Sequence, residues 1–98
     1  MRVRLTDEAR RQARLVRAWW RSHRDERLAF DEDLVAARDR LKTGPKHKVY
    51  GFIDGEPIRR MLLERTGYHL YYVIYESNDL VRIVAIWGAT LGAGPDLG

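Results

Sequence analysis

Apolar residues gather in three short runs near the carboxyl end of the chain, at residues 58–63, 68–75 and 80–87. Each run is six to eight residues long and rich in aromatic or β-branched side chains, a composition typical of β-strands. The two breaks between the runs, residues 64–67 and 76–79, contain Gly, Asn, Asp and Ser, which favour turns. Strands joined by such short breaks run antiparallel, so we predict a three-strand meander.

Side chains alternate between the two faces of a strand, and this rule divides each run. The first run separates Ile58, Arg60 and Leu62 from Arg59, Met61 and Leu63, and the second separates Tyr68, Leu70, Tyr72 and Ile74 from His69, Tyr71, Val73 and Tyr75. The third run is predicted to place Val81, Ile83, Ala85 and Trp87 opposite Arg82, Val84 and Ile86. Because apolar residues occur on both sides, we expect both faces to be at least partly covered.

The amino-terminal half of the chain has a helical period instead. Residues 2–5 are predicted to form a short strand, and Thr6 is a favourable N-cap for a helix that extends to about Arg24. A second helix is expected from about Glu26 to Lys42, ended by Thr43-Gly44-Pro45. Each helix has one apolar stripe, formed by Ala9, Ala13, Val16 and Trp20 in the first and by Phe30, Leu34, Ala37 and Leu41 in the second. Their short link predicts an antiparallel hairpin that buries both stripes against the sheet.

Two segments lack a clear period. Residues 43–57 are expected to be irregular because of Gly51, Gly55 and Pro57, with Tyr50, Phe52 and Ile53 packed beneath them as a small satellite cluster. The glycine-rich tail, residues 88–98, is expected to extend or to lie back on the sheet. The pattern as a whole predicts an α+β fold in which a short N-terminal strand and an antiparallel helical hairpin pack on an antiparallel three-strand C-terminal meander.

Composition limits the class of protein. The 98 residues are enough for one domain with a modest core, so we expect a single domain over residues 1–98. The chain has no cysteine, no apolar region behind its first arginines and no apolar stretch near the roughly 18 residues of a membrane span. These features favour a cytoplasmic protein without disulfides.

The positive charge is concentrated in the helical half. Residues 1–42 carry 12 Lys and Arg against 8 Asp and Glu, whereas residues 43–98 carry six of each. Four arginines fall on one side of the first helix, at Arg10, Arg14, Arg17 and Arg21. This row is either a solvated surface or a strip that binds an acidic partner.

Familiar catalytic motifs are missing from the sequence. No glycine-rich loop precedes a helix, and no Ser or Cys lies in a nucleophile-elbow context. His23, His47 and His69 lie in different elements without the spacing of metal ligands, so we expect neither a metal nor a cofactor.

The order strand, helix, helix and three-strand meander in about a hundred residues resembles the RelE/ParE superfamily of bacterial type II toxins. Three stretches carry the resemblance: LTDEARRQ at residues 5–12, IRRMLL and TGYHLYY at residues 58–63 and 66–72, and VRIVAIWG at residues 81–88. The resemblance implies a toxin held silent by a cognate antitoxin, as a hetero-oligomer. It also implies one of two targets, DNA gyrase for ParE-like toxins or ribosome-bound mRNA for RelE-like mRNA interferases.

RelE-like enzymes use basic residues on the sheet to stabilise phosphate and favour attack by the 2′-hydroxyl, without a metal. By this resemblance the candidate catalytic residues are Arg60, His69 and Arg82, and the candidate target contacts are Arg59, Arg65, Tyr71 and Trp87. Packing-only roles are the alternative for these side chains. The chain departs from the nuclease pattern where His69 replaces the usual arginine and where Ala89-Thr90-Leu91 replaces an arginine-rich segment. These departures favour a ParE-like or diverged toxin over an active ribonuclease, and a non-toxic binding module or co-repressor is a third possibility.

The antitoxin of this family wraps the helical hairpin and sheet of its toxin. By resemblance, the candidate antitoxin contacts are Arg10, Arg14, Arg17, Trp19 and Arg21. Trp19 has the alternative of partial burial at the edge of the core.

Overall fold

The computed structural model describes residues 1–88, so the expectations for the tail beyond Gly88 concern residues outside the described part. The elements follow in the order β1 (Arg2–Leu5), α1 (Asp7–His23), α2 (Ala29–Leu41), β2 (Val49–Ile53), β3 (Glu56–Leu62), β4 (Tyr68–Tyr75), the short 3₁₀ turn η1 (Glu76–Asn78) and β5 (Leu80–Gly88). No helix within residues 1–88 is both long and apolar enough to cross a membrane.

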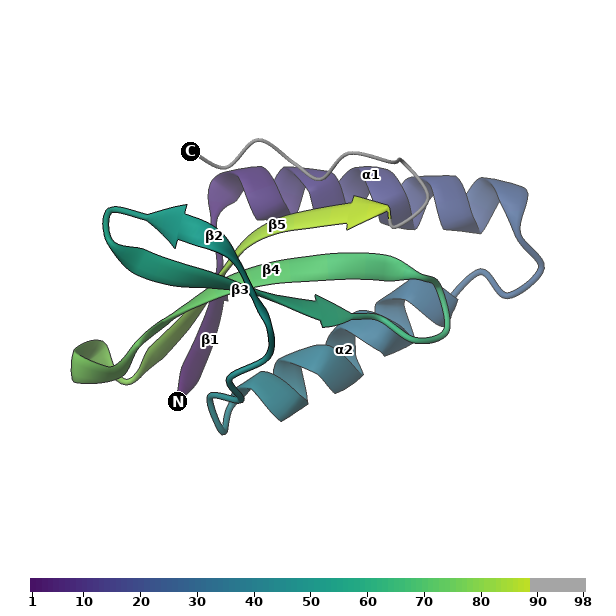
Figure 1. Cartoon of the computed structure of the whole chain (residues 1–98). Coiled ribbons are helices and arrows are strands. Elements are labelled where there is room, and N and C mark those ends of the chain that lie inside the picture. Colours follow the sequence, from purple (N-terminus) through teal and green to yellow (C-terminus); the bar gives the residue numbers. More distant parts are fainter. Residues whose placement is uncertain (89–98) are drawn as a thin grey trace.

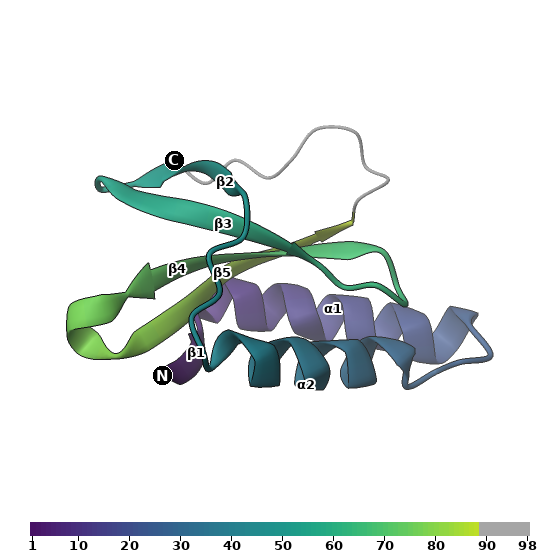
Figure 2. The ribbon, with the colours of Figure 1, turned by 60° about the horizontal axis from the view of Figure 1, so that its bottom comes forward.

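The five strands form one sheet in the order β1-β5-β4-β3-β2. The predicted meander of β3, β4 and β5 is antiparallel throughout, and β1 pairs with β5 in parallel. Both helices lie on the same face of the sheet, whereas the β2–β3 hairpin curls away on the other side (Figures 1 and 2). The predicted α+β architecture, with a helical hairpin on the sheet, is therefore confirmed.

Local chemistry explains where the helices begin. The Thr6 hydroxyl accepts a hydrogen bond from the Ala9 amide at 3.1 Å, which caps α1 as predicted. α2 begins at Ala29, three residues later than expected. The reason is that the carbonyls of Asp25 and Glu26 accept tight-turn hydrogen bonds from Arg27 and Ala29, at 2.9 and 3.1 Å, and so residues 24–28 form the link between the helices.

The main core lies between the helices and the sheet. Both predicted helical stripes contribute to it, and small residues of α1 allow close approach to β5. Its buried members are Val3, Ala9, Ala13, Phe30, Leu34, Ala37, Leu41, Met61, Leu63, Leu70, Tyr72, Val81, Ile83 and Ile86. A second, smaller cluster of Ile58, Tyr71, Val73 and Ala85 lies on the opposite face.

The expectation of an irregular segment holds for residues 43–48 but is wrong for residues 49–57. Val49–Ile53 forms β2, which pairs antiparallel with β3 through a turn at Asp54 and Gly55. Both turn residues have positive φ, 48° and 80°, as a two-residue hairpin turn requires. Of the expected satellite cluster, Ile53 packs on the second cluster but Phe52 is 64% exposed.

The predicted faces of β5 are also partly wrong. A bulge opposite Tyr71 and Tyr72 shifts the register between Ile83 and Ala85. Beyond it Ile86, rather than Ala85, faces the helices, and Ala85 and Trp87 join the opposite cluster. An extra residue on one strand reverses the alternation that follows it.

Candidate functional site

The face of the sheet opposite the helices, called here the open face, brings Arg60 and His69 together. Leu62 pairs with His69 across β3 and β4, so Arg60 is a diagonal neighbour of His69, at a typical Cα separation of about 7–8 Å. Two aromatic rings complete the group: the Tyr71 ring centroid lies 6.3 Å from that of His69 and 4.7 Å from that of Tyr50. The guanidinium carbon of Arg60 lies 6.0 Å from the centroid of Tyr50. These four side chains are called the open-face cluster.

The electrostatics of the open-face cluster favour a neutral histidine beside a fixed cation. Partial burial lowers the pKa of His69, and the positive charge of Arg60 lowers it further. Burial raises the pKa of the Tyr71 hydroxyl, although the Arg60 guanidinium beside it partly opposes that rise. Arg60 can therefore attract an anionic group while neutral His69 is able to accept a proton.

The third candidate catalytic residue, Arg82, lies apart from this pair. It is paired with Val73, four positions along β4 from His69, which at about 3.4 Å per residue is on the order of 14 Å. Its guanidinium carbon lies 5.7 Å from the ring centroid of Tyr75. The structure thus brings two of the three predicted catalytic groups together and separates the third.

The candidate target contacts lie in three places. Arg65 is in the β3–β4 turn, where it forms ion pairs with Glu26 at 3.5 Å and Glu32 at 3.3 Å. Tyr71 is only 1% exposed and belongs to the second hydrophobic cluster. Trp87 packs against that hydrophobic cluster and pairs with His69 across β4 and β5. Arg59 donates a hydrogen bond to the His47 carbonyl at 2.9 Å, away from the other three.

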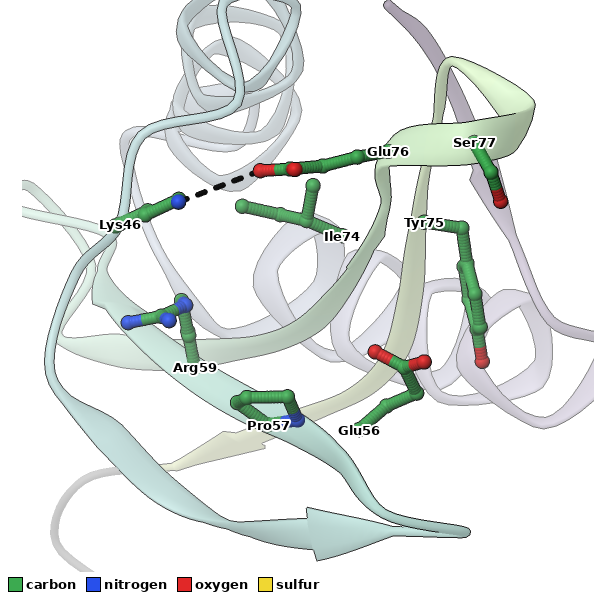
Figure 3. Close-up of a pocket in the computed structure, with 8 residues that line it drawn as sticks. All are labelled: Lys46, Glu56, Pro57, Arg59, Ile74, Tyr75, Glu76 and Ser77. Carbon is green, nitrogen blue, oxygen red and sulfur yellow. Dashed lines mark ion pairs between the residues drawn. The ribbon is translucent and has the colours of Figure 1, made fainter.

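Arg59 lines a pocket of about 340 Å³ between β3 and the end of β4 that leads into η1 (Figure 3). Lys46 and Glu76 point toward one another across it and form an ion pair at 3.3 Å. The lining contains two cations, Lys46 and Arg59, and two carboxylates, Glu56 and Glu76. This balance gives the pocket no preference for anions.

A basic groove of about 260 Å³ lies between the two helices and β1. Its apolar surface comes from Leu5, Ala13 and Leu34, and its cations are Arg4, Arg10, Arg14, Arg17 and Arg38. Among residues 1–88, no residue that lines the groove is acidic. An apolar floor with a rim of arginines is suited to an amphipathic segment that carries carboxylates.

The predicted antitoxin contacts divide between this groove and internal interactions. Arg10, Arg14 and Arg17 line the groove, but Arg17 also forms an ion pair with Asp31 of α2, which Arg21 contacts as well. Trp19 is 42% exposed, and its ring stacks on His23 at a centroid distance of 4.8 Å. The exposed position of Trp19 fits a surface contact better than a core position.

Several residues of these sites were not found from the sequence. Arg4 and Arg38 join the groove because β1 and α2 are brought beside α1, a contact with no local sequence signal. Tyr50 reaches the open-face cluster because β2 is a strand, and the Asp54-Gly55 turn was the available signal for that strand. Within residues 1–88, no group of three His, Asp or Glu side chains is placed to hold a metal ion.

Neither a protein-family model nor a curated protein sequence matches the chain. Among solved structures, it is similar to a chain described as the chromosomal ParDE TA system from P. aeruginosa. The two are 16% identical, the match covers 90% of this chain and 95% of the other, and the TM-score is 0.67. The resemblance expected from the sequence is therefore confirmed at the level of the fold, which is ParE-like.

Proposed function

We propose that this chain is the toxin of a type II toxin–antitoxin system, that it acts in the cytoplasm and that its target is DNA gyrase. The observation that carries the proposal is the fold shared with a ParDE chain over nearly the full length of both. Two departures from the nuclease pattern support gyrase over mRNA. His69 stands where the family's nucleases have arginine, and Arg82 lies far from His69.

The experiment that tests this proposal is induction of the chain without its antitoxin. We expect growth to stop, the purified protein to inhibit DNA supercoiling by gyrase, and ribosome-bound mRNA to stay intact. The His69→Ala variant should still inhibit growth, because the proposed action needs no proton transfer at that residue. Normal growth after induction, with folded protein present, would contradict the toxin assignment and support a non-toxic binding module or co-repressor.

A ribosome-dependent mRNA interferase is the second candidate, and the Arg60–His69 pair favours it. In this pair the arginine can bind a phosphate, and the neutral histidine can act as a general base. This candidate predicts cleavage of ribosome-bound message that is lost in His69→Ala and reduced in Arg60→Gln. Arg82→Gln is the matched control, since Arg82 lies on the same sheet but outside the cluster.

The proposed contacts with the target are Arg59, Arg65, Tyr71 and Trp87. Because Tyr71 is almost fully buried, its role in this proposal is to support Tyr50 and Arg60 rather than to make a large contact of its own. Alanine substitutions at Arg59 and Arg65, each assayed for supercoiling inhibition, test whether these two surfaces take part.

We further propose that a cognate antitoxin covers the basic groove and the neighbouring helical surface. The unbalanced charge supports Arg10 and Arg14 as direct contacts, and the exposed ring supports Trp19. Arg17 and Arg21, which are bound to Asp31, would need to exchange that carboxylate for one on the antitoxin.

Charge reversal in the groove tests the antitoxin contact. The double variant Arg10→Glu/Arg14→Glu should bind the antitoxin encoded beside the toxin gene at least about a hundredfold more weakly, because like charges at an interface cost several kcal/mol. Arg11→Glu is the control on the same helix, since Arg11 is paired with Glu8 outside the groove. Equal losses in the two variants would place the antitoxin elsewhere.

A further inference from the structure

The outer strand β2 carries apolar side chains at an edge of the sheet that no other strand within residues 1–88 covers. It is the last strand in the order, and no strand lies beyond it among residues 1–88. Its five residues, Val49–Ile53, include no charge and no proline, two of the devices that protect an edge, although a bulge lies between Val49 and Gly51. Val49, Tyr50 and Phe52 are all exposed, Phe52 most of all.

The hairpin register shows which backbone groups point outward. Ile53 pairs with Glu56 across a two-residue turn, and the closing pair of such a hairpin is hydrogen-bonded. The next pair, Phe52 with Pro57, is then not hydrogen-bonded, which suits Pro57 because it has no N–H. The N–H and C=O of Phe52 therefore point away from β3, toward the free edge.

Charges flank β2 with opposite sign at its two ends. Lys46 and Lys48 precede the strand, whereas Asp54 and Glu56 follow it. All four residues are exposed. Antiparallel pairing of two such strands would place the basic end of each beside the acidic end of the other, while parallel pairing would place like charges together.

We propose that β2 pairs antiparallel with β2 of a second copy of this chain, about a two-fold axis at Phe52. The two Phe52 residues would exchange backbone hydrogen bonds, and their rings would meet on one face of a continuous sheet. Gly51 would then lie opposite Ile53 of the second copy. No atom lies within 4 Å of the position that a Cβ on Gly51 would occupy, so the Ile53 side chain has room there.

Charge and location favour a second copy over another partner. An acidic segment would find cations only at one end of β2 and carboxylates at the other. The basic groove lies on the helical layer, on the far side of the sheet from the hairpin, so it stays open in this dimer (Figure 2). This inference does not depend on the proposed toxin function. A five-residue edge buries little area, so the dimer should be weak and concentration-dependent.

Sedimentation velocity of the full chain over a series of concentrations tests the dimer. We expect a reversible monomer–dimer equilibrium, and we expect Phe52→Lys to lower the association constant at least about tenfold by placing two like charges on the axis. Val35→Lys is the matched control, because Val35 is 69% exposed but lies on α2. A chain that stays monomeric into the millimolar range, or equal effects of the two variants, would overturn the proposal.

A second pair of changes tests the antiparallel register. Lys48→Glu should weaken the dimer. In this register Asp54 lies opposite Tyr50 and is a diagonal neighbour of Lys48 of the second copy, so Asp54→Asn should weaken the dimer about two- to fivefold in the parent chain by removing that favourable diagonal charge pair. In the Lys48→Glu background the same Asp54→Asn change should strengthen the dimer, since it removes a repulsion. Asn tolerates the positive φ of position 54, so the turn should be kept. An effect of the same sign in both backgrounds would exclude this register.

Discussion

The two faces of the sheet are covered in different ways. On the face toward the helices, fourteen buried residues from the two helices and the sheet form one continuous core. On the open face, four of residues 1–88 form the buried cluster, and Arg60, His69 and Tyr50 lie around them. The first face therefore has the contacts that hold the fold, while the second has charged and titratable groups that the fold does not require.

This difference separates stability from function in the molecule. Changes on the helix-covered face should lower the free energy of unfolding strongly, because they leave cavities or unsatisfied polar groups. Changes in the open-face cluster should alter charge and proton binding more than stability.

The largest difference is expected between two leucines on opposite faces. Leu70→Ala removes a fully buried side chain beneath the helices and should lower the free energy of unfolding by about 2–5 kcal/mol. Leu62→Ala, on the open face where Leu62 is 47% exposed, should change it by less than about 1 kcal/mol. Urea denaturation of both variants gives the two values. Similar losses would show that the faces do not differ in this way.

Asp33 should come next, because it is a buried carboxylate on α2. Its Oδ2 accepts hydrogen bonds from the Thr66 amide at 2.9 Å and the Thr66 hydroxyl at 2.7 Å, which fastens α2 to the β3–β4 turn. Asp33→Ala leaves that amide without its acceptor and should cost about 1–3 kcal/mol in unfolding free energy. Asp39→Ala, at an exposed position of the same helix, is the control and should have little effect. No difference between the two would mean that the Thr66 bonds do not stabilise the helical layer.

A smaller loss is expected for Tyr72→Phe. The Tyr72 hydroxyl accepts from the His47 amide at 3.3 Å and donates to the Pro45 carbonyl, which holds the segment between α2 and β2 against the sheet. The ring stays in the substitution, so only the hydrogen bonds are lost, at about 0.5–1.5 kcal/mol in thermal or urea unfolding. Tyr75→Phe, whose ring lies on the open face, is the control. A larger loss at Tyr75 would reverse the proposed order of the two faces.

The sequence predicts the helix-covered face better than the open face, for a physical reason. Helix caps and apolar stripes depend on residues that are close in the sequence. The Thr6 cap and the buried stripe that contains Phe30 and Leu41 can therefore be predicted from the local sequence. The bulge in β5 has no comparable signature, and it decides that Ala85 faces away from the helices. β2 was missed because Gly55 was interpreted as a breaker, although Asp-Gly is a hairpin signal.

The candidate sites were predictable only within the meander, where consecutive strands pair with each other. Arg60 and His69 lie on paired strands of the meander, so alternation places them on one face. The distance of Arg82 depends on the strand register, and the presence of Arg4 and Arg38 in the groove depends on how α1, α2 and β1 pack. Such contacts are long-range in sequence and follow from tertiary packing alone.

The smallest expected effect is on the pKa of His69, and it measures the charge coupling on the open face. Since burial is the larger cause of the lowered pKa and Arg60 the smaller, Arg60→Gln should raise the pKa of His69 but leave it below 6.5. A lowered folded-state pKa means that the unfolded chain binds the proton more readily, so the contribution of His69 to stability is present above about pH 6.5 and is lost as the pH falls toward the folded-state value. NMR titration of the imidazole signals measures the pKa directly, with Arg82→Gln as a control that should not move it. If Arg60→Gln leaves the pKa of His69 unchanged, the charge of Arg60 does not influence His69. The mRNA interferase candidate then loses its electrostatic basis, while the gyrase proposal stands.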